Sequence, residues 1–195
     1  MSMGALLNLQ MDTDIVKQKM RASDVVNIVV AVLGSSPFVE SAEWGMECHI
    51  MAWQTAEWAF RLIEDLLSDT EAIHWTPESA SGLFQPILHL QQAVDTNIND
   101  DIVEYQISMT DSIASILDHE SRNPSFCLVL LPESGSAPFH TLLTLNQELF
   151  MPSIWHSISD DQTSSLATEA QEALGHLKKA MTHAIIATAS EDANP

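Results

Sequence analysis

The chain has 195 residues, of which 46% are hydrophobic and 17% charged, and its formal net charge is −20 at neutral pH. It carries 27 acidic residues but only 7 lysines and arginines, so the imbalance reflects a shortage of cations. Direct binding to nucleic acid or to an anionic membrane requires clustered Lys and Arg, so the composition argues against both. The apolar content is high enough for a buried core and excludes a disordered chain.

Targeting and redox features of the sequence predict a cytoplasmic protein. The longest apolar run, residues 25–33, is interrupted by Asn27 and falls far short of the roughly 20 residues that cross a bilayer. The N-terminal residues lack the basic start and long apolar stretch of a secretory leader. The two cysteines, Cys48 and Cys127, lie far apart without a CxxC pairing, so we expect reduced, buried thiols.

The first two helical segments are both rich in apolar residues. One is predicted over residues 14–33, although its β-branched half, residues 25–33, is also compatible with a strand. The next is predicted over residues 39–68 and is apolar around most of its circumference, which favours a place at the centre of a helical bundle. One of its apolar faces contains Trp44, Cys48, Met51, Trp58, Leu62 and Leu66, and the opposite face contains Met46, Trp53, Phe60 and Leu67.

The middle of the chain contains the clearest helix signals. Thr76 followed by Pro77 predicts the start of a third helix, which runs to about residue 94 and is kinked or divided at Pro86. A fourth helix is predicted over residues 96–120, with apolar and acidic side chains on opposite sides. The apolar side contains Ile98, Ile102, Tyr105, Met109, Ile113 and Ile116, and the acidic side contains Asp100, Glu104, Asp111 and Asp118.

The C-terminal third begins with the longest predicted break, over residues 122–138. Within it, the apolar stretch 126–131 is compatible with a short strand that pairs with residues 25–33. A fifth helix is predicted over residues 139–151. The last helix begins near Ser159, whose spacing to Gln162 fits a capping box. Its expected buried residues are Leu166, Ala170, Leu174, Leu177, Met181 and Ile185.

These elements predict an all-α fold. We expect a single compact bundle of about six helices, forming one domain over residues 1–195 with frayed ends at 1–11 and 189–195. The alternative is an α+β fold with a minor two-stranded element from residues 25–33 and 126–131.

Catalytic and metal-binding motifs are not evident, so neither a metal nor a cofactor is predicted. Glu71 and His74 form the sole Glu-x-x-His match, without the partner motif that a carboxylate-bridged site needs. His176 and His183 share a helical face with Glu169, Glu172 and Lys179, but seven residues of helix span about 10.5 Å, too far for one ion. Glu172 and His176 have the spacing of a surface pair within one helix.

The acidic side of the fourth predicted helix is the candidate binding surface. It contains Asp100, Glu104, Asp111 and Asp118, with Asp101 beside them. Four charges over about 27 Å of helix are sparse beside duplex DNA, which carries a charge about every 1.7 Å. Imitation of nucleic acid therefore requires several acidic helices side by side.

The leading functional hypothesis is a non-enzymatic protein that binds and occludes a positively charged protein partner, as an inhibitor, immunity protein or nucleic-acid mimic does. The expected partner is a basic protein or complex, including one that itself binds nucleic acid. Trp75 and Trp155, on less regular segments, are candidate anchors at such an interface.

Two other classes of function remain open. A helical scaffold or chaperone-like adaptor, compatible with a homodimer, would bind a partner through apolar surface. Salt separates it from the leading hypothesis, because high ionic strength weakens electrostatic docking but not apolar docking. The third class is a small helical enzyme or metal protein whose site has no local motif. The remaining interpretation is that the charge only keeps an apolar-rich bundle soluble and marks no binding surface.

Overall fold

Helices account for every regular element that the structure, a computed structural model, describes. The described residues are 14–21, 24–35, 46–67, 72–92, 99–131, 137–156 and 165–192. They form α2 (Asp14–Arg21), α3 (Val25–Ser35), α4 (Met46–Asp65), α5 (Pro77–Gly82), α6 (Gln85–Gln92), α7 (Asp100–Glu120), α8 (Pro124–Leu130), α9 (Ala137–Glu148), the 3-10 turn η1 (Ser153–Trp155) and α11 (Ser165–Asp192). The all-α prediction is confirmed, with more and shorter helices than the six expected.

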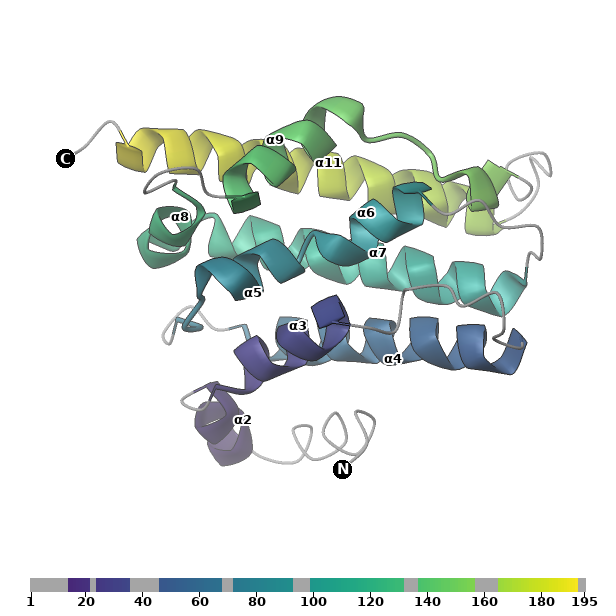
Figure 1. Ribbon diagram of the computed structural model, residues 1–195, viewed down its shortest axis with the longest axis horizontal. Helices are drawn as coiled ribbons and strands as arrows, with labels where there is room; N and C mark the ends of the chain where they lie inside the picture. The colour runs from purple at the N-terminus through teal and green to yellow at the C-terminus, as the bar shows by residue number, and fades with distance from the viewer. Residues whose placement is uncertain are drawn as a thin grey trace.

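Three long helices, α4, α7 and α11, lie side by side and run in the same direction (Figure 1). The α4–α7 contacts show this directly, because Ser108 donates to Glu57 over 3.0 Å and Ser112 donates to Glu64 over 2.7 Å. Residue numbers thus rise together along both helices. Helix α7 lies between α4 and α11, so most of its side chains are buried against one neighbour or the other.

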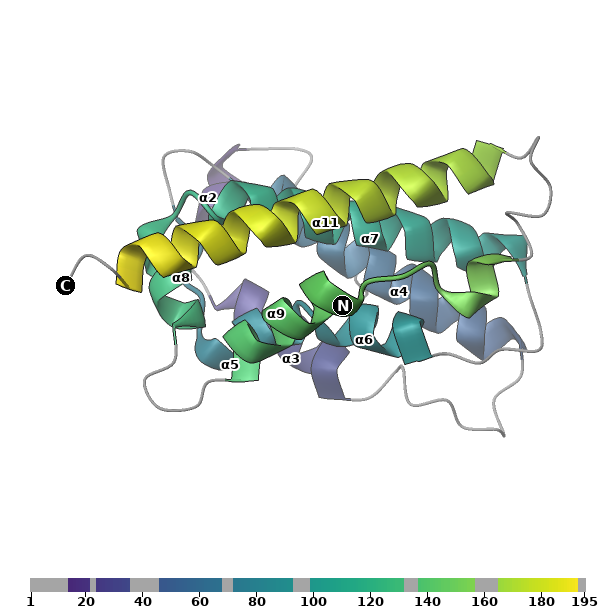
Figure 2. The ribbon, with the colours of Figure 1, turned by 90° about the horizontal axis from the view of Figure 1, so that it is seen from above.

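Short helices carry the chain back between the long ones. Helices α5 and α6 return from the end of α4 to the start of α7, and α9 returns from the end of α7 toward the start of α11 (Figure 1). Seen from above, α3, α5, α6 and α9 lie together on one side of the long-helix layer (Figure 2). The core fills the space between these two layers. Its largest fully buried side chains include Phe60, Phe84, Phe126 and Trp155.

The two-stranded alternative is wrong for the described residues, because both proposed strands are helical. In α3, the buried Val26, Val29, Val30 and Leu33 are spaced three and four residues apart, which is helical periodicity. Residues 126–130 belong to α8, and a cap fixes its start. The side chain of Asn123 accepts a hydrogen bond from the Ser125 amide, directly before the first-turn proline. A side-chain cap therefore favours the helix in residues 126–130 in spite of their strand-like composition.

The predicted start and division of the third helix are confirmed. The Ser79 amide donates to the Thr76 hydroxyl over 3.2 Å, and the Thr76 amide donates to the Ser79 hydroxyl over 2.9 Å. This reciprocal pair is a capping box. The chain then divides into α5 and α6 directly before Pro86, whose ring cannot continue an uninterrupted helix.

Helix α4 is not the centre of the bundle, contrary to the expectation from its apolar circumference. Its second half is buried, but Met51 is 65% exposed and Cys48 is also exposed. Both cysteines are free, and Cys127 alone is buried. The central place belongs to α7, whose many small and polar side chains allow close packing on two sides. Trp44 lies outside the described residues.

Several helices begin or end at other residues than predicted. The first predicted helix is two helices, α2 and α3, and α7 begins at Asp100 rather than near residue 96. Helix α9 covers Ala137–Glu148, slightly before its predicted range. The proposed capping box of Ser159 and Gln162, Ile98 and the predicted frayed start at 1–11 fall outside the described residues. The predicted frayed end at 189–195 is wrong for residues 189–192, which belong to α11, and its last three residues are not described. None of the described helices combines the length and apolar character needed to cross a membrane.

Candidate functional site

The seam between α7 and α11 repeats every seven residues. Nδ1 of His176 donates to Oδ1 of Asp111 over 2.7 Å, and Nδ1 of His183 donates to Oδ1 of Asp118 over 2.8 Å. Both pairs join residues 65 apart in the chain. A constant offset at seven-residue spacing is the register of two parallel helices packed side by side. The heptad before Asp111 places Glu104 and Glu169 at the same offset, so that this position of the register contains two acids instead of an acid and a histidine.

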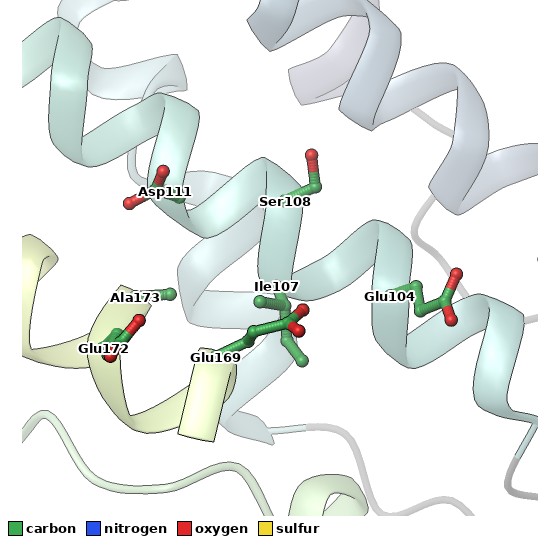
Figure 3. A pocket seen from close by; sticks show the side chains of 7 residues that line it. All are labelled: Glu104, Ile107, Ser108, Asp111, Glu169, Glu172 and Ala173. Carbon is green, nitrogen blue, oxygen red and sulfur yellow. The ribbon is translucent and has the colours of Figure 1, made fainter. Parts of the chain in front are cut away.

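An acidic cleft lies in this part of the seam between α7 and α11. The cleft has a volume of about 540 Å³ and is lined by Glu104, Ile107, Ser108, Asp111, Glu169, Glu172 and Ala173. Figure 3 shows carboxylates from both helices around Ile107 and Ala173. Four of these lining residues are acids and none is a cation. The acidic cleft therefore concentrates negative charge contributed by two helices.

Asp118 lies outside the acidic cleft, and its charge is compensated. Beside the bond from His183, Arg122 donates to its Oδ2 over 3.0 Å. The hydrogen bond from His183 is the main reason that the pKa of Asp118 is lowered, and the charges of Arg122, His183 and Lys179 lower it further against an opposing effect of burial. These groups line a second cavity, of about 430 Å³, at the ends of α7 and α11. The seam is thus acidic at its start and mixed in charge at its end.

The remaining predicted acids are at the very start of α7. Asp100 and Asp101 are exposed in its first turn, where the positive end of the helix dipole favours negative charge. The Asn99 side chain caps the helix by accepting a hydrogen bond from the Asp101 amide over 2.8 Å. Of the five predicted acids, the structure brings Glu104 and Asp111 together in the acidic cleft and places the other three outside its lining.

The two predicted tryptophan anchors are core residues. Trp75 is 4% exposed and its Nε1 donates to Oε2 of the buried Glu120 over 3.1 Å. Trp155 is 1% exposed and its Nε1 donates to Oε1 of Gln106 over 2.8 Å. An interface anchor must be reachable by the partner, so neither indole fits that role in the folded chain. Their polar atoms serve buried hydrogen bonds instead.

Two residues of the acidic cleft, Glu169 and Glu172, were not among the predicted binding residues. The sequence shows that they share a helical face with His176, but not which helix that face meets. The predicted surface pair of Glu172 with His176 also differs from the structure, in which His176 bonds to Asp111 on α7. The sequence does contain a signal for this pairing. Acids recur every seven residues from Glu104, and histidines are seven residues apart from His176, so the two helices share the same spacing.

No group of three or more His, Cys, Asp and Glu side chains is arranged to hold a metal ion within the described ranges. Burial raises the pKa of the Cys127 thiol, which leaves less of the reactive thiolate. In comparisons by sequence and by structure, no protein-family model, curated protein or solved structure matches this chain.

Proposed function

We propose that the protein binds a positively charged protein partner by docking it on the acidic cleft, and that it acts by covering the partner's basic surface. The observation that carries this proposal is that four carboxylates from α7 and α11 line one cleft whose lining contains no Lys or Arg. Like charges held close together repel one another, and a cation placed between them relieves that repulsion.

The shape of the acidic cleft suits a lysine or arginine side chain. Ile107 and Ala173 form an apolar floor, being 6% and 3% exposed. Long cationic side chains lay their aliphatic stems on apolar surface while the charged head reaches polar groups. The carboxylates of Glu104 and Glu169 are available to such a head group. At distances beyond contact, the net charge of −20 speeds the encounter with a basic protein.

A matched pair of triple variants tests the proposal. The cleft variant is Glu104→Gln, Glu169→Gln and Glu172→Gln, which leaves the Asp111–His176 bond in place. The control variant changes three acids that are also exposed but lie outside the cleft lining, Glu47→Gln, Glu78→Gln and Glu148→Gln. Both variants change the net charge by the same amount and contain the same type of substitution.

Affinity for a decalysine peptide, measured by calorimetry at moderate salt, is the readout. The cleft variant is expected to bind about tenfold more weakly than the natural chain, since exposed ion pairs contribute about 0.2–1 kcal/mol each. The control variant is expected to lose no more than about twofold. Equal losses in both variants would show that total charge, and not the acidic cleft, attracts the peptide. Binding that survives high salt would favour an apolar docking surface instead.

A further inference from the structure

Resting on the function proposed above, we propose that His176 makes docking on the acidic cleft sensitive to pH, so that a cationic partner binds at neutral pH and is released on mild acidification. The geometry behind this is the hydrogen bond from Nδ1 of His176 to Oδ1 of Asp111, at 2.7 Å. Asp111 lines the acidic cleft, so the histidine is attached directly to one of the carboxylates that a partner meets.

Both side chains of this pair are open to solvent. His176 is 37% exposed and Asp111 is 57% exposed, so the imidazole exchanges protons with water without any opening of the fold. A neutral imidazole donates its N–H and leaves the charge of Asp111 intact. A protonated imidazole makes the same hydrogen bond but adds a positive charge beside it. The acidic cleft then presents three uncompensated carboxylates instead of four.

The charged groups around His176 determine how much its protonation changes the local charge. Asp111 faces it from α7, and its own helix has Glu169, Glu172, Lys178, Lys179 and His183 within two turns. The other helices that pack on α11 are α8, whose sole titratable side chain is Cys127, and α9, which carries His140 and Glu148. Acids therefore outnumber lysines around His176, and a proton gained there removes negative charge from the part of the seam that would bind a cation.

His183 provides a matched comparison within the same seam. It makes the equivalent bond to Asp118, with Nδ1 and Oδ1 2.8 Å apart and a side chain that is 45% exposed. One heptad, about 10.5 Å, separates it from His176, which exceeds the Debye length of about 8 Å at physiological salt. Arg122 and Lys179 already line its cavity. Protonation of His183 therefore changes the charge of the acidic cleft far less than protonation of His176.

The test measures the affinity of decalysine, which has no histidine, at pH 7.5 and pH 5.5 for the natural chain, His176→Gln and His183→Gln. We expect the natural chain and His183→Gln to bind about fivefold more weakly at the lower pH, and His176→Gln to change by less than about twofold. Glutamine keeps a hydrogen-bond donor near Asp111 and cannot gain a proton, and both positions are on the surface.

The outcomes separate this inference from the proposed function. Binding at pH 7.5 that is unchanged at pH 5.5, or that weakens equally in His176→Gln, would overturn the role of His176 while leaving the acidic cleft as a docking site. The inference would also be overturned if acidification weakened binding by His176→Gln as much as by the natural chain but left binding by His183→Gln unchanged. That result would assign the pH effect to His183. Absence of binding at pH 7.5 would overturn the proposed function and this inference together.

Discussion

Gly82 lies at a close contact between the short helices α5 and α3, where there is no room for a side chain. At this position a Cβ atom would lie against Cγ1 of the buried Val30, far inside van der Waals contact. The close approach of α5 to α3 therefore requires glycine. Gly175 on α11 is different, because a Cβ there would meet nothing within 4 Å.

The two glycines predict opposite effects of the same substitution. Gly82→Ala is expected to lower the free energy of unfolding by about 1–3 kcal/mol, because Val30 and the backbone must shift to admit the methyl group. Gly175→Ala is expected to raise it by about 0.5–1 kcal/mol, since alanine is the better helix former on an exposed face. Urea denaturation measures both. Stabilisation by both substitutions would contradict the close α3–α5 contact.

The hydrogen bonds of Glu120 explain why Trp75 is buried and is not an exposed anchor. This carboxylate is 1% exposed and accepts hydrogen bonds from Nε1 of Trp75 and, over 3.0 Å, from the Asn123 side chain. A buried carboxylate is costly unless it is fully hydrogen-bonded. The indole is therefore needed inside, where it also packs edge-on against Phe126 with the ring centroids 5.2 Å apart. Aromatic content alone does not distinguish such a residue from an interface anchor.

At the scale of helices, periodicity predicts which residues of an element are buried but not which element covers them. The apolar side of residues 100–120 is buried as expected, with Ile102, Met109, Ile113 and Ile116 inside. Capping also predicts the start of α5 correctly. The acidic side of the same helix, however, faces α11, and this pairing depends on packing between segments far apart in sequence. The acidic cleft could therefore be predicted only in part, through Glu104 and Asp111.

The Asp118 bond between α7 and α11 predicts a pH-dependent contribution to stability. Because the folded-state pKa of Asp118 lies below its ordinary value of 3.8, the contribution is present above that value and is lost as the pH falls through the folded-state pKa. Asp118→Asn is therefore expected to cost about 1 kcal/mol or less at pH 7. The difference between variant and natural chain should shrink as the pH falls below 3.8. A difference that stays constant over this range would contradict the assignment.

At the scale of the whole molecule, the parallel long helices make the α7–α11 face electrically uneven. Parallel packing places the starts of both helices together, with Glu104, Glu169 and Glu172, and the end of α7 beside the second half of α11, with Arg122 and Lys179. An antiparallel pair would have mixed these groups. The net charge attracts a basic protein from any direction, while the uneven face favours one orientation on arrival. Composition alone predicts the attraction, but the orientation follows from the topology.

Cross-linking of bound decalysine tests the central claim most directly. A carbodiimide joins carboxylates to amines that are in contact, without a spacer, and mass spectrometry then identifies the carboxylates that have reacted. We predict that Glu104, Glu169 and Glu172 carry most of the peptide, well above Glu47, Glu78 and Glu148, which are also exposed. A peptide distributed evenly over the exposed acids would contradict the claim that the acidic cleft is the docking site.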